Sequence, residues 1–254
     1  MDPALYALHH HTYTEDLPFW RWLARQAQGP VLELGCGTGR VYLPLLEEGI
    51  ALWGVDRQAA MLRYLRDQAA PEQRTRLRLI QADMRALGFA PGAFALVLVP
   101  CNTFSLLDAP ARAQVLAAVA RLLRPGGCLA LSLPNPLRLA SLPPEGESEP
   151  EGLFWHPESG HPVQVSSAWH YEPGRWSVMW HYDHLWPDGM VERTTVRQIH
   201  HLIPPDEQRQ AFAGFGLTVE AQYGDFDRSP WQAQAPYLIW VLRRLSPTEP
   251  EEAP

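Results

Sequence analysis

The chain has 254 residues, of which 46% are hydrophobic and 19% are charged, and its formal net charge is −7. These totals are typical of a soluble globular domain with an insertion, and they disfavour a nucleic-acid partner, which usually needs a basic surface. All 21 basic side chains are arginine, which excludes a P-loop lysine and a Schiff-base lysine.

The cysteines and the chain start carry no processing or metal signal. Cys36, Cys101 and Cys128 lie far apart in apolar stretches, and no Cys or His spacing is typical of zinc, so we expect buried thiols and no metal. No apolar run approaches the roughly 18 residues of a membrane span. The N-terminus lacks the basic-then-apolar order of a signal peptide. We therefore expect a cytoplasmic protein without a membrane partner.

The first half of the chain alternates apolar strands with amphipathic helices. In chain order the pattern predicts a helix over 15–28, a strand over 31–34, a helix over 40–48, a strand over 50–55, a helix over 58–70, strands over 77–81 and 93–99, a helix over 110–123, a turn over 124–127 and a strand over 128–133. Such alternation indicates βαβ units and hence a parallel sheet in an α/β fold.

The pattern changes at Pro134. Residues 134–152 are rich in proline and glutamate, which predicts a loop with partial disorder. The remaining elements are three aromatic strands over 163–171, 175–186 and 190–202, a helix over 205–215, and strands over 217–222 and 237–243. The Asp188-Gly189 pair between the second and third aromatic strands is a strong hairpin signal. The tail, 246–254, is expected to be disordered.

A glycine-rich segment, VLELGCGTGR, spans residues 31–40 and follows the first predicted strand directly. A strand, a glycine turn and a helix N-terminus form a nucleotide-type site at the carboxyl edge of a parallel sheet. A dinucleotide fingerprint counted from Gly35 would require glycine at position 40, where the chain has Arg40. Glu33 would repel a pyrophosphate, but it suits a ligand that carries an ammonium group.

The order ELGCGTGR resembles the first signature motif of class I S-adenosylmethionine (SAM)-dependent methyltransferases. Four further segments extend the resemblance, and together they span residues 31–133. The family's ribose-binding acid is matched by Trp53-Gly54-Val55-Asp56, and its adenine-binding turn by Gln81-Ala82-Asp83-Met84. Its methionine-lining segment is matched by Pro100-Cys101-Asn102-Thr103-Phe104, and the turn before the fifth strand by Leu123-Arg124-Pro125-Gly126-Gly127.

The resemblance implies an α/β fold: a Rossmann-like, seven-stranded, mostly parallel sheet with helices on both faces and an antiparallel last strand. A small antiparallel β insertion follows the fifth strand. Residues 1–133 and 203–245 would form the SAM-binding core. Residues 134–202 would form a proline-rich loop and a three-stranded insertion, serving as a lid, as an acceptor region or as a dimer region.

The resemblance also implies SAM as the cofactor. Asp56 would accept hydrogen bonds from the ribose hydroxyls and Asp83 from the adenine amino group. Tyr13 lies where similar enzymes carry a tyrosine that closes over SAM, and Met61 would cover the base. The alternative for Asp56 and Asp83 is that they are ordinary acidic residues of the turns after their strands. The alternative for Tyr13 and Met61 is that they pack in the core. The predicted cofactor-binding residues are Tyr13, Glu33, Gly35, Cys36, Gly37, Gly39, Arg40, Asp56, Arg57, Met61, Asp83, Met84, Pro100 and Asn102.

The acceptor site is expected outside the shared core, in the N-terminal segment and the insertion. Its candidate catalytic residues are Tyr13, His181 and His200. Packing of the Trp-rich insertion onto the core or onto a second subunit is the alternative, and the run at residues 9–11 is expected to be a solvated chain end. The C-terminal part, with Tyr223-Gly224-Asp225-Phe226-Asp227, resembles small-molecule methyltransferases, including enzymes that N-methylate amino sugars.

The function implied is transfer of a methyl group from SAM to nitrogen or oxygen of a small molecule, by in-line displacement, giving S-adenosylhomocysteine (SAH) and requiring no metal. A homodimer is compatible with the sequence. Three alternatives stay open: a methyltransferase acting on RNA, DNA or protein, a NAD(P)-binding oxidoreductase that Arg40 disfavours, and a methyltransferase fold that serves only as a binding or dimerisation module.

Overall fold

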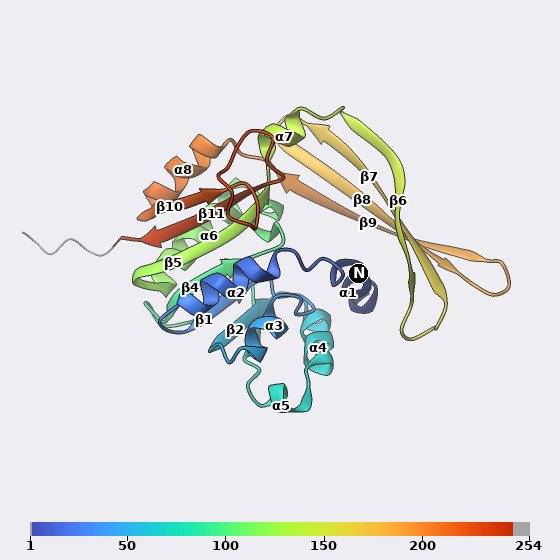
Figure 1. Ribbon diagram of the computed structural model, residues 1–254, viewed down its shortest axis with the longest axis horizontal. Coiled ribbons are helices and arrows are strands. Elements are labelled where there is room, and N and C mark those ends of the chain that lie inside the picture. Colours follow the sequence, from blue (N-terminus) through green and yellow to red (C-terminus); the bar gives the residue numbers. More distant parts are fainter. Residues whose placement is uncertain (1, 246–254) are drawn as a thin grey trace, which may run out of the picture.

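The computed structural model describes residues 2–245, which form a central sheet and a second, smaller sheet (Figure 1). The strands of the central sheet are β1 Val31–Leu34, β2 Leu52–Asp56, β3 Leu79–Gln81, β4 Phe94–Val99, β5 Leu123–Pro134, β10 Leu217–Tyr223 and β11 Tyr237–Arg244. Within the described residues these seven strands have the order β10-β11-β5-β4-β1-β2-β3. Strands β1 to β5 run parallel, and β11 is antiparallel to both neighbours. The predicted Rossmann-like sheet is therefore confirmed.

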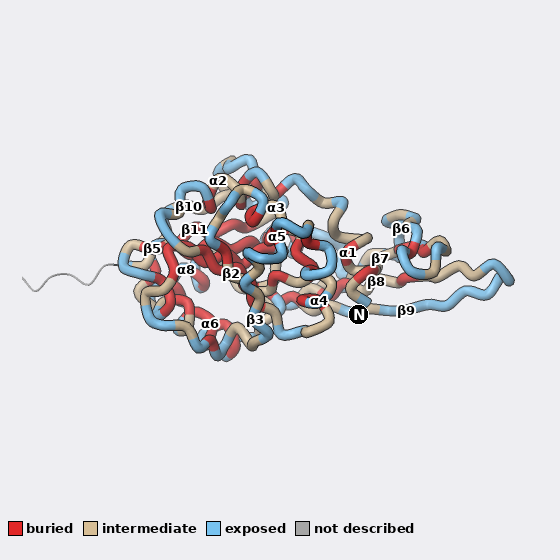
Figure 2. Tube along the Cα trace, turned by 90° about the horizontal axis from the view of Figure 1, so that it is seen from below, coloured by how far each residue is buried: buried red, intermediate tan, exposed pale blue. Residues whose placement is uncertain are grey.

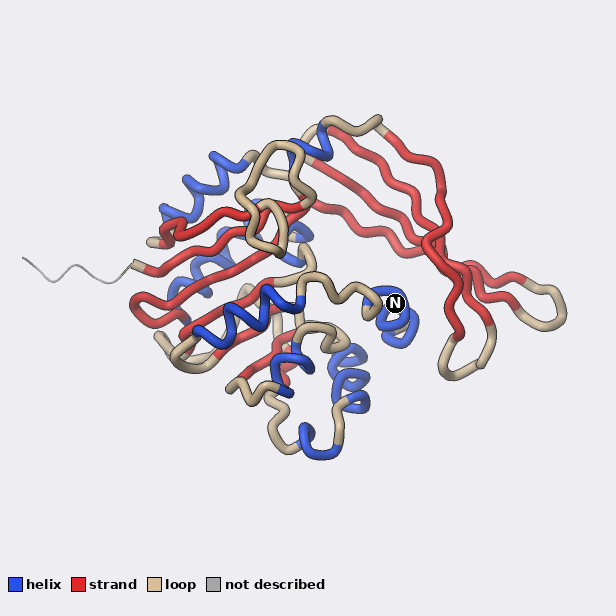
Figure 3. The backbone as a smooth tube through the Cα atoms, in the orientation of Figure 1, coloured by secondary structure: helices blue, strands red, loops and turns tan. Residues whose placement is uncertain are grey.

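Helices cover both faces of this sheet (Figure 3). They are α2 Leu17–Gln26, α3 Tyr42–Glu47, α4 Ala59–Gln68, the short α5 Pro71–Arg74, α6 Ala109–Leu122 and α8 Pro205–Gly214. Trp20 of α2 and Leu45 of α3 share one buried cluster with Leu96 of β4, whereas Val115 of α6 packs with Val97 in the other. Covered on both faces, β4 is buried along its whole length. Among residues 2–245 no helix is both long and apolar enough to cross a membrane.

The start of β5 differs from the prediction. Residues 124–127 were expected to form a turn, but β5 already begins at Leu123, which pairs with Phe94. The register then shifts, and Cys128 pairs with Leu96. The four residues between are accommodated as an irregularity within the strand, with Gly126 at φ +70.

The insertion is a four-stranded antiparallel sheet, with strands β6 Glu145–Trp155, β7 Pro162–Glu172, β8 Arg175–Leu185 and β9 Val191–His201 in that order. Three of these strands were predicted, but the prediction of a loop over 134–152 was wrong. The segment contains α7 (Pro136–Ala140), capped by Asn135, and the edge strand β6. An edge strand tolerates Pro150 because one side of it stays unpaired, and its register with β7 shifts there. The predicted disordered tail, 246–254, lies outside the described residues.

An additional helix, α1 (Pro3–His10), was missed by the sequence pattern. Asp2 caps it by accepting a hydrogen bond from the N–H of Ala4 (2.7 Å), and Pro3 occupies its first turn. The helix lies between the core and the inner face of the insertion sheet (Figure 1). The expectation that residues 9–11 are a solvated end was therefore wrong, since the His9 side chain is only 9% exposed. Figure 2 shows burial concentrated in the central sheet and exposure at the far turns of the insertion.

Candidate active site at the glycine turn

The glycine turn, residues 35–39, connects β1 to α3 at the carboxyl edge of the central sheet. The N–H of Gly35 donates to the carbonyl of Val55 (2.8 Å), and the N–H of Gly37 donates to Oδ2 of Asp56 (3.0 Å). At Gly35 φ is +74, and a Cβ there would lie 2.7 Å from Cγ2 of Thr103. The turn therefore fits against β2 and the segment after β4 only as glycine.

Two carboxylates reach the same edge from neighbouring strands. Asp56 pairs with Gln81 in the parallel β2–β3 ladder, two residues before Asp83. One oxygen of Asp56 accepts from the glycine turn and Oδ1 accepts from the N–H of Gln58 (2.8 Å), which leaves about two of its acceptor positions. Hydrogen bonds from Arg85 hold Asp83 and lower its pKa to about 2. Asp83 is thus held as an ionised acceptor, and Asp56 keeps acceptor positions beside the glycine turn.

Five other predicted cofactor residues lie around this edge. Cys36, within the turn, is buried, as are Pro100 directly after β4 and Met61 in α4. Met84 is half-buried against the core, whereas Arg57 is exposed. The structure thus gathers the predicted set at one edge of the sheet, and their contact with a cofactor stays a prediction.

Two buried oxygen atoms beside the turn have no hydrogen-bond partner. These are Oε2 of Glu33, a residue 2% exposed at the end of β1, and Oδ1 of Asn102, after β4. Burial raises the pKa of Glu33 to about 8, although Arg40 opposes this, so a further cation is needed to keep Glu33 ionised at neutral pH. An unmet buried acceptor costs about 1–3 kcal/mol. N–H donors of a ligand, such as those of an ammonium group, are the partners that these acceptors lack.

Arg40, a predicted cofactor residue, is engaged within the protein. Its guanidinium forms a two-pronged ion pair with Asp16 (2.6 Å for each bond) and donates to the carbonyl of Tyr13 (2.7 Å) and to Sγ of Cys101 (2.8 Å). Asp16 is only 1% exposed and also accepts from Nε1 of Trp20 (2.9 Å). Burial disfavours the charge on Arg40, but the bonds to Asp16 outweigh it and raise the pKa of Arg40. Arg40 therefore holds the N-terminal segment against the glycine turn.

Two N-terminal tyrosines have different positions. The hydroxyl of Tyr13 lies 3.0 Å from that of Tyr237, and its ring packs edge-on to Phe226. Tyr6 of α1 instead lies over the turn, with Cε1 3.9 Å from where a Cβ on Gly37 would stand. The sequence argument chose Tyr13 and missed Tyr6 because α1 was not predicted. The Asp2-Pro3 pair, a capping residue followed by proline, is the signal that identifies this helix.

His200, a candidate catalytic residue, lies buried where β9 meets the short helix η1 (Thr103–Leu106). Its Nδ1 is 2.7 Å from Oγ of Ser105, which donates to the carbonyl of Asn102 (2.6 Å), so the imidazole is the donor to Ser105. Burial lowers the pKa of His200 to about 4, and the charge of Arg112 adds to this. Arg112 also bonds the carbonyl of His201. Through these contacts His200 fixes the insertion to the segment after β4.

His181, another candidate catalytic residue, points away from the glycine turn. It alternates along β8 with Trp180 and Tyr182, whose side chains face α1, so its own side chain lies on the opposite face of the sheet. There Nδ1 of His181 is 2.9 Å from Oγ1 of Thr195 on β9. The geometry therefore does not support a catalytic role for His181.

Helix α1 connects the glycine turn to the insertion. Nδ1 of His9 is 2.9 Å from the hydroxyl of Tyr182, and Nε2 of His9 bonds the carboxylate of Glu151. On the side of the core, Nε2 of His11 lies 3.0 Å from Oγ1 of Thr38, within the glycine turn. Histidine contacts thus join α1 at once to the predicted donor site and to the predicted acceptor region.

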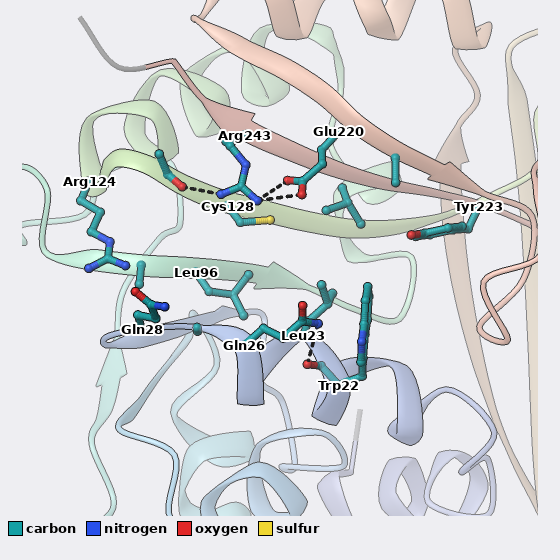
Figure 4. A pocket seen from close by; sticks show the side chains of 15 residues that line it. Trp22, Leu23, Gln26, Gln28, Leu96, Arg124, Cys128, Glu220, Tyr223 and Arg243 are labelled. Atoms are coloured by element: carbon teal, nitrogen blue, oxygen red, sulfur yellow. Dashed lines mark hydrogen bonds and ion pairs between the residues drawn. The ribbon is translucent and has the colours of Figure 1, made fainter.

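A cavity of about 600 Å³ lies elsewhere, between α2 and strands β4, β5, β10 and β11 (Figure 4). Trp22 and Tyr223 line it together with the ion pair of Arg243 and Glu220 (2.6 Å) and with Cys128. None of its lining residues belongs to the predicted site. At the glycine turn, by contrast, α1 lies over the sheet edge.

Comparison with known proteins agrees with this geometry. Residues 31–127 match the family model described as a methyltransferase domain. The putative methyltransferase YqeM of Bacillus subtilis (strain 168) is 25% identical over 229 residues, which cover 89% of this chain and 88% of that protein.

Solved structures share the fold over most of the chain. The methyltransferase CcbJ from Streptomyces caelestis matches with a TM-score of 0.75 and 23% identity, over 92% of this chain and 98% of that one. SAM-bound CalS10, an amino pentose methyltransferase from Micromonospora echinaspora, matches with a TM-score of 0.70 and 19% identity, over 94% and 96%. Residues 31–127 therefore match a methyltransferase domain, and the chain shares the fold of solved SAM-dependent methyltransferases over most of its length, as the resemblance noted in the sequence implied.

Proposed function

We propose that this enzyme transfers a methyl group from SAM to an amine nitrogen of a small molecule. Transfer to an oxygen atom of a small molecule is the alternative. SAM as the methyl donor is supported by two buried oxygen atoms without a hydrogen-bond partner, one on Glu33 and one on Asn102. They lie beside a glycine turn within a methyltransferase domain. These oxygens suit the ammonium group of the methionine part. A pyrophosphate would bring negative charge to the same place.

Each remaining part of the donor has a candidate partner. Asp56 keeps acceptor positions for two ribose hydroxyls, and Asp83 is held in an ionised state for the adenine amino group. When bound, SAM supplies a methyl group already activated on a sulfonium. The protein's residues therefore need only orient the acceptor and exclude water.

The inner face of the insertion is the proposed acceptor side. Trp180 and Phe154 contribute half-buried aromatic side chains there, next to the buried Tyr182, and the carboxylate of Glu151 bonds Nε1 of Trp180 and Nε2 of His9. Aromatic faces and a carboxylate favour a cationic or amine-bearing acceptor. CalS10, which shares the fold, is an amino pentose methyltransferase. The cytoplasmic location and a homodimer, both expected from the sequence, stay predictions.

A methyl-transfer assay tests the proposal. The protein would be incubated with methyl-labelled SAM and, separately, with amino sugars, other small amines, phenols, tRNA and denatured protein. We expect label in a low-molecular-weight amine with equimolar SAH, and loss of both products in Asp56→Ala. Label confined to tRNA or protein would refute the small-molecule assignment and support the macromolecular alternative.

A further inference from the structure

His10 occupies the space between the glycine turn and the insertion. It is four residues after Tyr6, so both rings lie on one face of α1, with their centroids 4.3 Å apart. Tyr6 lies over Gly37, while the ring of His10 meets Trp180 edge-on at 5.8 Å. His10 therefore lies where the proposed donor and acceptor sides meet.

Nε2 of His10 is buried and has no hydrogen-bond partner. Its neighbours differ, because His9 bonds Tyr182 and Glu151, and His11 bonds Thr38. Burial lowers the pKa of His10 to about 3, and the nearby guanidinium of Arg40 adds to this. The imidazole is thus neutral at physiological pH, and one ring nitrogen carries a lone pair. Because this atom lies between the glycine turn and the insertion and no protein group satisfies it, it is available to a ligand there.

We propose that Nε2 of His10 accepts a hydrogen bond from the N–H of the methyl acceptor and so turns the nitrogen lone pair towards the donor methyl. This assignment rests on the proposed function. In the transfer, the acceptor lone pair forms the new N–C bond while the S–C bond breaks and its electron pair returns to sulfur. The methylated nitrogen carries the positive charge and later loses a proton to solvent. The contacts of His9 hold α1 so that His10 keeps this orientation.

Sinefungin allows a test without knowledge of the acceptor. In this SAM analogue a carbon bearing a primary amine replaces the methylated sulfur, so its N–H groups extend towards the acceptor side, whereas SAH has nothing there. The dissociation constants of sinefungin and SAH would be measured by calorimetry for the wild type, His10→Phe and His10→Gln. His161→Phe, the same exchange at a histidine that packs on Trp186 of the insertion, is the matched control.

In His10→Phe we expect sinefungin to bind at least about tenfold more weakly, the scale of one hydrogen bond to a charged group, with SAH within about twofold of the wild type. His10→Gln retains an acceptor oxygen and should keep most of the sinefungin affinity, and His161→Phe should change neither ligand. Equal weakening of both ligands in His10→Phe would overturn the assignment in favour of α1 packing, and so would unchanged affinity for both. A wild type that binds no SAH would instead refute the proposed function itself.

Discussion

A pair of glycine substitutions separates backbone strain from cofactor binding. Gly37 and Gly49 both have positive φ, +51 and +80, and both have room for a methyl group. A Cβ at Gly37 would find its nearest atom 3.9 Å away, on Tyr6, and at Gly49 nothing lies within 4 Å. Only Gly37 belongs to the turn proposed to touch the methionine part of SAM.

The expected magnitudes follow from these surroundings. Alanine in the left-handed region costs roughly 1–2 kcal/mol, partly offset by the lower entropy of the unfolded chain. Gly37→Ala and Gly49→Ala should therefore each lower the free energy of unfolding by about 1 kcal/mol. Gly37→Ala should also place a methyl group where a ligand approaches the main chain, and SAH should bind at least about tenfold more weakly. Gly49→Ala should bind SAH as the wild type does.

Urea unfolding gives the stability of both variants, and calorimetric titration gives the SAH dissociation constants. The reasoning would be refuted if Gly37→Ala, shown to be folded, bound SAH as tightly as Gly49→Ala. It would also be refuted if both variants lost the same affinity, because the effect would then come from strain alone.

Further substitutions test other parts of the site. Arg40→Met leaves the buried carboxylate of Asp16 uncompensated and should cost about 3–5 kcal/mol in urea unfolding, with a loss below about 1 kcal/mol arguing against a structural ion pair. Burial lowers the pKa of His200 in the folded protein to about 4, below the usual histidine value of about 6.5. Stability should therefore fall as the pH drops from about 6.5 to 4, by about 3 kcal/mol more than in His200→Gln. Parallel pH profiles of the two proteins would contradict this. Asp83→Ala should weaken SAH binding about tenfold, and by more than Arg85→Ala does. Arg85→Ala loses an exposed ion pair and should change stability by less than about 1 kcal/mol. Weaker SAH binding in Arg85→Ala than in Asp83→Ala would exclude the adenine role.

The sheet could be predicted because its strands are buried on both faces. Residues 93–99 form a continuous apolar run, and the structure buries all of β4. The signature segments could be placed on one edge because parallel strands end together. The position of Asp56 beside the glycine turn, where it accepts from Gly37, follows from that rule.

The errors concern segments whose structure depends on distant partners. The proline-rich segment before 152 becomes strand β6 because β7 offers it an edge. Helix α1 has eight residues, too few to be stable alone, and its contacts come from the insertion more than a hundred residues later. The ion pair of Arg40 with Asp16 was not foreseen, because Asp16 lies 24 residues earlier in the chain, and the cofactor role of Arg40 stays a prediction. Local pattern carries no information about such pairings.

The turn at residues 35–39 is claimed to hold the amino-acid end of SAM, with Asp56 on its ribose. Calorimetric titration of the wild type and Asp56→Ala with SAH, and with NAD for comparison, tests this most directly. We predict that SAH binds the wild type, that NAD does not, and that Asp56→Ala loses about 1.5–3 kcal/mol of binding free energy, roughly 10- to 150-fold in affinity. Unchanged SAH affinity in a folded Asp56→Ala protein, or binding of NAD in place of SAH, would contradict the claim.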